Sequence, residues 1–294
     1  MGTRVAVELW ADDPGLAARA MEAVIAEMRR TDELMSTYKP ESQLSRVNAE
    51  AHERPVEVDP EIVDIVAKSF EFSRLSDGAF DVTYASVGYL YDYRAHARPT
   101  AEQVAAALPG VDYRQVQVDR DRNTIRFLRK GVRVDLGGIA KGRAVDRGIE
   151  ILRALGIEHA MVNAGGDTRL LGDRRGKPWI VGIRDPRNEG SMVTRLPLED
   201  EAISTSGDYE RYFEEDGVRY HHILVPGTGQ SAREVRSATV IGADATLTDA
   251  LSTTVFVLGV ERGMALVSRL PGVEAVVVDK DGRIFYSDGL APPQ

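Results

Sequence analysis

The sequence predicts an α+β fold in which helices interleave with mixed or antiparallel strands in a single mixed α/β body, residues 1–294. Three observations support this prediction. Segments with helical spacing of apolar residues alternate along the chain with segments in which apolar and polar residues alternate. No linker, repeat or low-complexity tract interrupts them, so one domain is expected. The composition, 43% hydrophobic and 28% charged, is typical of a globular protein with a sizeable core.

The N-terminal segments predict a strand, a helix and a loop. Residues 3–10 alternate like a half-buried strand, and residues 14–36 follow with the spacing of an amphipathic helix. The polar segment 36–48, broken by Pro40, is expected to be a loop. One face of the predicted helix carries a stripe that we expect to face the core: Leu16, Met21, Val24, Ile25, Met28 and Met35.

Two further helices carry capping signals. Residues 59–76 begin with Asp59 as the predicted N-cap and a proline at the first helical position. Residues 100–110 combine Thr100 and Gln103 in a capping box and end at a Pro-Gly pair. Both helices therefore have a start that local side-chain chemistry can specify.

In the rest of the sequence, predicted strands and helices follow one another. Residues 116–136 predict a hairpin and a further strand, which leads into a helix at 139–156. Two helices, 246–259 and 260–270, meet at a glycine, and a hairpin closes the chain at 273–287. The strand-like segments between them, separated by Gly and Pro, are 160–167, 179–186, 201–213, 218–225 and 237–242.

Charge and composition narrow the class of protein. The net charge of −9 argues against a nucleic-acid partner, because phosphate contacts need a basic face. The absence of cysteine excludes disulfides, thiolate metal sites and cysteine catalysis. No apolar run approaches the roughly 20 residues of a membrane span, and residues 1–13 lack a signal-peptide core. We therefore expect no transmembrane segment, and either a cytoplasmic protein or a mature form whose export segment has been removed.

Residues 134–148, VDLGGIAKGRAVDRG, place glycines and a lysine at the expected junction of a strand and a helix. Glycine lets a ligand approach the backbone, and a helix N-terminus offers free N–H groups to an anion. A tight connection without a ligand is the alternative. Gly137 and Gly142 have the spacing of a P-loop, but Arg143 and Ala144 stand where Lys and Ser or Thr are required. The motif therefore argues against a nucleoside triphosphatase.

Two pairs of side chains are candidates for chemistry. Asp249 and Thr253 are four residues apart, so a carboxylate and a hydroxyl lie on one helical face. Mg²⁺ prefers such oxygen ligands, although a helix-terminus acid is the alternative for Asp249. His221 and His222 are adjacent on a predicted strand, so only one can face a cleft. A structural role is the alternative for each histidine.

Glycine-rich strand ends form a third group of candidates. Residues 163–167 and 204–213 repeat a Gly-Asp pattern after apolar strands, and residues 76–83 turn into another strand. Each is an ordinary turn signal by itself, but together these strand ends could line one cleft. Phe80 is most simply a core residue, and Asp81 a turn or cap residue.

Taken together and in order, eight segments resemble the bacterial FAD:protein FMN transferase family, also called the ApbE family. The resemblance implies the flavin-transferase type of α+β fold, with two lobes possible around an FAD cleft. The segments extend over essentially the whole chain: residues 1–3, 35–48, 77–83, 134–146, 163–167, 206–213, 221–229 and 248–259.

The resemblance implies roles for three sets of residues. His222 matches the histidine that the family requires for function. Mg²⁺ would be held by the carbonyl of Gly138 and by Asp249 and Thr253, with Ser252 beside them. FAD contacts would come from Met1, Tyr38, Ala79, Phe80, Asp81, Asp135, Lys141 and Ile223.

The implied reaction is Mg²⁺-dependent transfer of FMN from the substrate FAD to a Thr or Ser hydroxyl of a target protein, with release of AMP. The implied acceptors are flavin-bearing subunits of membrane redox complexes that face the periplasm and carry a short Ser/Thr-Gly-Ala-Ser/Thr-like motif. The implied location is periplasmic, compatible with a lipid anchor on the full-length protein. Hydrolysis of FAD to FMN and AMP, and non-catalytic FAD storage, are the alternatives.

One position departs from the family pattern. Val225 stands where the family usually has an Asp, three residues after His222. His222 would then lack an acidic partner. With an ordinary imidazole pKa near 6.5, its action as a base is expected to fall as the pH drops through that range.

Overall fold

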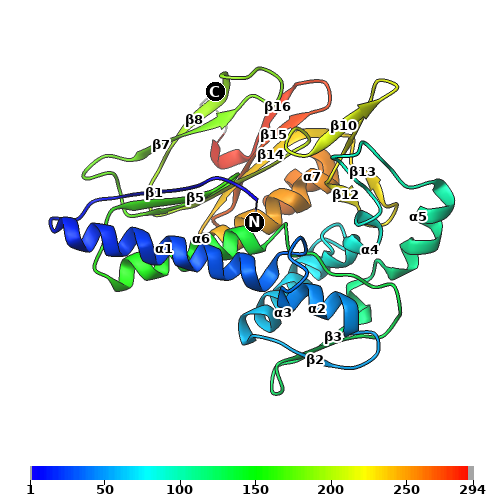
Figure 1. Ribbon diagram of the computed structural model, residues 1–294. Coiled ribbons are helices and arrows are strands. Elements are labelled where there is room, and N and C mark those ends of the chain that lie inside the picture. Colours follow the sequence, from blue (N-terminus) through cyan, green and yellow to red (C-terminus); the bar gives the residue numbers. More distant parts are fainter. Residues whose placement is uncertain (1, 291–294) are drawn as a thin grey trace.

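The computed structural model describes residues 2–290 and is built around a seven-stranded sheet (Figure 1). Neighbouring strands are antiparallel throughout this sheet, which confirms the predicted α+β class. In spatial order the strands are β1 (Val5–Leu9), β5 (Ala160–Ala164), β6 (Asp167–Leu171), β9 (Ala202–Gly207), β14 (Val235–Gly242), β15 (Glu274–Asp279) and β16 (Ile284–Tyr286).

Different elements cover the two faces of the sheet (Figure 1). Helices lie on one face: α1 (Pro14–Met35), α6 (Ala140–Ala154) and α7 (Ala245–Val267). The hairpin of β7 (Trp179–Arg184) and β8 (Met192–Leu198) packs on the other. Consecutive residues of β6 alternate as a strand requires, since Leu171 is buried with the helices and Leu170 with the hairpin.

A second group of elements packs on the side of α7 away from the sheet. One hydrophobic cluster includes residues of α3, β4 and α7, so the two groups share a core. This group contains α2 (Gln43–Glu50), α3 (Pro60–Leu75), β2 (Val56–Glu57), β3 (Val116–Asp119) and β4 (Thr124–Phe127). The other short elements are η1 (Val82–Tyr84), α4 (Ala85–Gly88), α5 (Ala101–Ala107), η2 (Leu108–Gly110), η3 (Tyr113–Gln115), β10 (Tyr212–Glu215), β11 (Val218–His221), β12 (Leu224–Val225), β13 (Gln230–Ser231) and η4 (Asp288–Leu290).

The predicted caps are confirmed, and two local predictions are wrong. Asp59 accepts a hydrogen bond from the Glu61 N–H, and the Thr100–Gln103 capping box is present. The expected loop 36–48 instead contains the start of α2, where the Ser42 hydroxyl caps the helix. In the predicted core stripe of α1, Met21 is 40% exposed, because it lies at the edge of the buried face.

Residues 132–136 do not form the predicted strand, although their side chains alternate in burial. The side chain of Asn48 takes the place of a neighbouring strand: it donates to the Val134 carbonyl and accepts from the Val134 N–H. The Asp135 N–H donates to the Val82 carbonyl. The segment is therefore extended and anchored without joining a sheet.

Helix α7 is broken at Gly259, where φ is 80°, as the pair of predicted helices requires. By length and composition alone α7 could cross a membrane, so the expectation that no apolar run approaches that length is wrong. However, 56% of its most apolar window is buried within the fold. Contact with the sheet on one side and α3 on the other explains why both of its faces are apolar.

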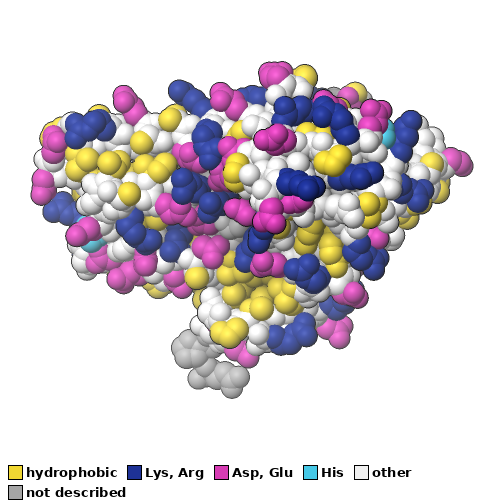
Figure 2. Space-filling view, turned by 90° about the horizontal axis from the view of Figure 1, so that it is seen from below, with side chains coloured by type: hydrophobic (Ala, Val, Ile, Leu, Met, Phe, Trp, Pro, Cys, Tyr) yellow, Lys and Arg dark blue, Asp and Glu magenta, His cyan; other side chains and the backbone are white. Residues whose placement is uncertain are grey.

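The surface carries charges of both signs. Figure 2 shows acidic and basic side chains interspersed over one face, with hydrophobic side chains in several places and a larger group of them in the lower middle. Several of the charges form exposed pairs, such as Lys68 with Glu71 and Arg184 with Glu210. Exposed pairs of this kind contribute at most about 1 kcal/mol each, so the fold depends on its buried contacts.

Candidate active site

Helices α6 and α7 approach each other closely at Gly142. A Cβ on this residue would lie 2.0 Å from the Ala245 carbonyl oxygen and 2.9 Å from the Asp249 Cβ. The approach allows the Gly142 N–H to donate to Asp249 Oδ2 at 3.0 Å. One turn later on α6, Asp146 accepts hydrogen bonds from the N–H groups of Ala245 and Thr246. Gly142 thus serves helix packing, and α6 fixes the first turn of α7.

Gly142→Ala is expected to destabilise the protein, because the added methyl group collides with backbone atoms of α7. Overpacking costs typically about 1–3 kcal/mol, and backbone cannot move aside as a side chain can. Urea unfolding followed by circular dichroism measures the change. Gly227→Ala is the control, since a Cβ there meets nothing within 4 Å and φ is not positive. An unchanged urea midpoint for Gly142→Ala would contradict this account of the packing.

A buried cluster of opposite charges lies where α6, α7 and β6 meet. Lys141 Nζ lies 3.0 and 3.2 Å from the two carboxylate oxygens of Asp249, and 2.9 Å from Asp167 Oδ2. The side chains of Asp249 and Asp167 are 3% and 2% exposed. Lys141 also donates to the Gly137 carbonyl. The cluster therefore holds two buried carboxylates against one ammonium.

The charge imbalance changes the pKa values of the cluster. Burial, and then repulsion from Asp167, raise the pKa of Asp249 against the attraction of Lys141. Burial lowers the pKa of Lys141, but the two carboxylates outweigh it and raise the pKa overall. Lys141 is thus held as a cation, and the raised pKa of Asp249 shows that two negative charges are unfavourable in this cluster.

Asp167 is a site residue that the sequence analysis misses. It begins β6, directly after the glycine turn of residues 163–167. A Gly-Asp pair is common at turns, and only the fold brings this one to Lys141. The sequence signal that could have found Asp167 is its place in one of the glycine-rich strand ends suggested to line one cleft.

The predicted oxygen ligands lie together. Thr253 is one turn beyond Asp249 on α7, and a Cβ on Gly138 would lie 3.3 Å from Thr253 Oγ1. Ser252 is buried and donates to the Asp249 carbonyl at 3.0 Å. The N-cap of α7 is Asp244, so the alternative interpretation of Asp249 as a capping acid is wrong.

Asp135 and Tyr38 lie on the loops that border the cluster. Asp135 accepts hydrogen bonds from the Thr37 hydroxyl and the Gly137 N–H, both at 2.7 Å. Tyr38 is 74% exposed, and its hydroxyl accepts a hydrogen bond from Arg211 at 3.0 Å. An exposed aromatic ring of this kind is available to a planar ligand.

The segment containing Ala79, Phe80 and Asp81 is largely structural in its side chains. Phe80 is buried and packs edge-on against Phe72. Asp81 caps η1 by accepting from the N–H and hydroxyl of Thr83, and it also accepts from the Tyr113 N–H. Ala79 is half-buried. The core and cap roles considered for Phe80 and Asp81 are therefore present.

The two adjacent histidines have different environments, but they do not share a strand as predicted, because β11 ends at His221. His221 Nε2 lies 2.6 Å from the Ala232 carbonyl, and the Ile223 N–H donates to His221 Nδ1 at 3.3 Å. The proton of His221 must then be on Nε2, and the ring is fully engaged within the core. Ile223 is itself buried. His221 therefore has a structural role.

His222 lies at a bend after β11, where its N–H donates to the Arg211 carbonyl at 3.1 Å. Burial lowers the pKa of His222 to about 3, and the charges of Arg211 and Lys141 contribute in the same direction. Within residues 2–290, the buried Nδ1 atom has no hydrogen-bond partner. The imidazole is therefore neutral at pH 7. The prediction that His222 stops acting as a base as the pH drops through 6.5 is wrong, because its pKa lies well below that range.

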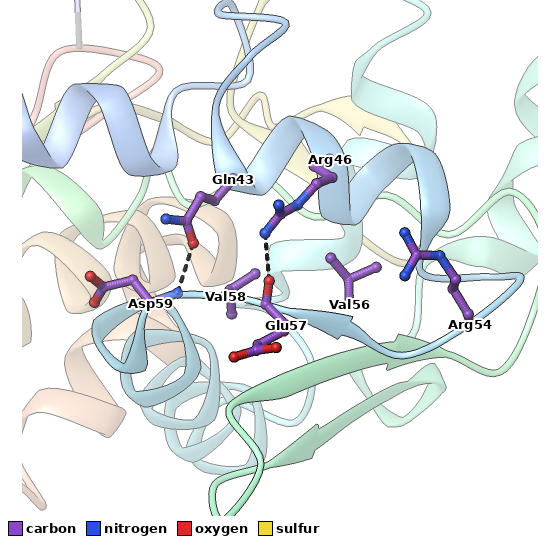
Figure 3. Close-up of a pocket in the computed structure, with 7 residues that line it drawn as sticks. All are labelled: Gln43, Arg46, Arg54, Val56, Glu57, Val58 and Asp59. Atoms are coloured by element: carbon purple, nitrogen blue, oxygen red, sulfur yellow. Dashed lines mark hydrogen bonds between the residues drawn. The ribbon is translucent and has the colours of Figure 1, made fainter.

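Two cavities lie apart from these residues. One, of about 410 Å³, is lined by α2 and β2 residues (Figure 3), and its polar groups are partly engaged with each other. There Gln43 accepts from the Asp59 N–H, and Arg46 donates to the Glu57 carbonyl. The other, of about 460 Å³, has Asp146 and Arg143 in its wall. None of the predicted site residues lines either cavity.

A family model matches most of the chain. The model of the ApbE family matches residues 1–277. The chain belongs to the ApbE family. An FAD:protein FMN transferase of Treponema pallidum (strain Nichols) is 33% identical over 309 residues, which cover 99% of this chain and 85% of that relative.

Solved structures of ApbE proteins share the fold. The ApbE protein of Thermotoga maritima is 36% identical with a TM-score of 0.91, over 98% of this chain and 94% of that one. The flavin transferase ApbE of Vibrio cholerae is 31% identical with a TM-score of 0.86, with the same coverage. The predicted family, fold class and enzyme class are confirmed: the chain is a transferase.

The roles of individual residues in this ApbE family member stay predictions, and one of them cannot be placed. Met1 lies outside the described residues. The backbone nearby is described from Gly2, and the Gly165 N–H donates to the Arg4 carbonyl at 3.0 Å. The start of the described chain therefore lies against the turn that leads to Asp167.

Proposed function

We propose that this chain transfers FMN from FAD to a Thr or Ser hydroxyl of an acceptor protein, in a Mg²⁺-dependent reaction that releases AMP. The observation that carries the proposal is the convergence of Lys141, Asp249 and Thr253 in one buried cluster, with the neutral His222 close enough for the Lys141 charge to lower its pKa. The names of the curated relatives support flavin transfer from FAD.

The donor atoms fit Mg²⁺. Among the described residues, no three His, Cys, Asp or Glu side chains come together. A metal site built from several carboxylates or histidines is therefore not indicated there. Mg²⁺ usually takes one or two carboxylates and completes its shell with other oxygens. Asp249, the Thr253 hydroxyl and the Gly138 carbonyl would supply such a set. The ion would neutralise the charge of the FAD diphosphate and polarise its phosphorus–oxygen bonds.

The side chains divide the chemistry between them. Lys141, fixed as a cation by Asp167 and Asp249, would bind a phosphate oxygen of FAD. The neutral imidazole of His222 would accept the proton of the acceptor hydroxyl. The hydroxyl oxygen would form a bond to the phosphorus on the FMN side, and the bond from that phosphorus to the bridging oxygen would break. AMP would leave with that oxygen.

The acceptor and the location are part of the same proposal. We place the enzyme in the periplasm, acting on flavin-bearing subunits of membrane redox complexes. The support is the resemblance of the eight sequence segments. At the edge of the site, the exposed Tyr38 and its hydrogen-bond partner Arg211 are available to an acceptor protein.

Covalent labelling tests the proposed reaction. An acceptor domain carrying the Ser/Thr-Gly-Ala-Ser/Thr-like motif is expected to gain the mass of one FMN moiety when the enzyme, FAD and Mg²⁺ are all present. Intact-protein mass spectrometry measures the gain, and ultraviolet fluorescence in a denaturing gel shows that it is covalent. FMN alone is not expected to label, because the diphosphate bond supplies the energy. Labelling from FMN would contradict the proposal.

Measurement of AMP separates the alternatives. Release only with acceptor supports transfer, whereas equal release without acceptor indicates hydrolysis of FAD. Tight FAD binding with no AMP in either case indicates storage. An acceptor with its motif hydroxyl replaced by alanine is the matched control, and it should remain unlabelled.

A further inference from the structure

Strand β9 presents two serine hydroxyls to α7, and they contact different turns of the helix. Ser204 Oγ lies 2.8 Å from Thr248 Oγ1. Ser206 Oγ lies 2.9 Å from Ser252 Oγ and 3.1 Å from Thr253 Oγ1. Because the two serines are two residues apart on a strand, they point to the same face of the sheet.

The direction of the hydrogen bonds around Ser206 follows from the groups involved. Ser252 donates its single proton to the Asp249 carbonyl, which can only accept. The contact between Ser252 and Ser206 is then a hydrogen bond only if Ser206 donates. Since the Ser206 proton is then used on Ser252, Ser206 can only accept from Thr253, and Thr253 must be the donor. All three contacts are satisfied in this one direction.

We propose that Ser206 is a positioning residue for the metal site. By accepting the Thr253 proton, it leaves the lone pairs of Thr253 Oγ1 free for a cation. This inference rests on the proposed function, because the cation is the Mg²⁺ assigned there to Thr253 and Asp249. Ser206 itself does not bind the ion in this account.

Thr253 has no equivalent acceptor on its own helix. A helical Thr hydroxyl ordinarily donates to the carbonyl four residues earlier, as Thr254 does to Ala250 at 2.7 Å. For Thr253 that carbonyl belongs to Asp249, which already accepts from Ser252. Without Ser206, the Thr253 proton is free to turn toward the cation and repel it.

Binding of Mn²⁺, used as a probe without FAD, tests the inference on the full chain. Ser206→Ala is expected to weaken Mn²⁺ binding about tenfold, the worth of one hydrogen bond, when measured by titration calorimetry. Ser206→Thr keeps the hydroxyl and is expected to restore the affinity. In turnover, Ser206→Ala should raise the Mg²⁺ concentration for half-maximal rate about tenfold while the rate at saturating Mg²⁺ changes little.

Ser204→Ala is the matched control, since it removes the equivalent hydroxyl contact to Thr248 from the same strand face. We expect it to lower the melting temperature without metal as Ser206→Ala does, but to keep wild-type Mn²⁺ affinity. Wild-type affinity in Ser206→Ala would overturn the role of Ser206 and leave the proposed function standing, and so would equal weakening in both variants. A wild-type protein that binds no Mn²⁺, with or without FAD, would overturn both.

Discussion

His222→Ala is expected to lower the rate of FMN transfer about 10²–10⁴-fold and to keep FAD binding, because only the proton acceptor is removed. Burial holds the imidazole neutral, so its lone pair is free, although the same burial lowers its basicity. Single-turnover assays of AMP release give the rate, and quenching of flavin fluorescence gives the FAD affinity. Loss of FAD binding in this variant would contradict the assignment and indicate a structural residue.

The pH dependence follows from the same burial. The profile of kcat/KM reports pKa values of the free enzyme. With the His222 pKa near 3, kcat/KM at saturating Mg²⁺ is not expected to fall between about pH 7.5 and 5.5, where an ordinary imidazole would become protonated. A fall with a midpoint near pH 6.5 would contradict the buried, neutral state of the ring.

His221→Ala tests whether His221 has a structural role while His222 has the catalytic one. The His221 ring hydrogen-bonds the Ala232 carbonyl and packs edge-on against Phe256. Its removal is expected to lower the free energy of unfolding by about 1–3 kcal/mol, since a buried carbonyl loses its donor. The rate of the folded protein should change little. Equal loss of rate in the two histidine variants would defeat the distinction.

Asp249→Asn is expected to lose Mn²⁺ binding and to lower the transfer rate about 10³-fold or more, because a bound metal is worth several kcal/mol to the transition state. FAD affinity should no longer respond to Mg²⁺. The Asn oxygen can still accept from the Gly142 N–H, so the packing of α6 on α7 is kept. Calorimetry with Mn²⁺ and FAD titrations with and without Mg²⁺ measure these effects.

Stability distinguishes this result from a structural role for Asp249. In the variant, Lys141 pairs with Asp167 alone, so the repulsion between the two buried carboxylates disappears. We therefore expect no loss of melting temperature without metal. Asp244→Ala is the control on the same helix: it removes the α7 N-cap, costs about 1 kcal/mol, and keeps Mg²⁺ dependence. Wild-type Mg²⁺ dependence in Asp249→Asn would show that Asp249 holds no metal.

Features fixed by neighbouring residues could be predicted from the sequence. The capping box of Thr100 and Gln103 and the shared face of Asp249 and Thr253 depend on spacings of three and four residues, which the helix converts directly into contacts. The different environments of the adjacent histidines were also predicted, although β11 ends at His221 and strand geometry is not their cause.

Features that depend on distant segments could not be predicted. Residues 132–136 look like a strand, but the side chain that meets their backbone comes from Asn48, 86 residues earlier than Val134. Asp167 reaches Lys141 only after β6 and α6 have packed together. The pKa of His222 depends on burial by the whole fold, which no local pattern reports.

The contact of α6 with α7 also sets the order in which the site can be assembled during synthesis. Lys141 and Asp249 are separated by 108 residues, so at about 5–20 residues per second Asp249 follows Lys141 by roughly 5–20 seconds. Until then the nascent chain carries the glycine turn and the lysine without the α7 carboxylate. The cluster therefore cannot close before α7 has been made, and cation binding at Asp249 cannot nucleate the folding of the N-terminal half.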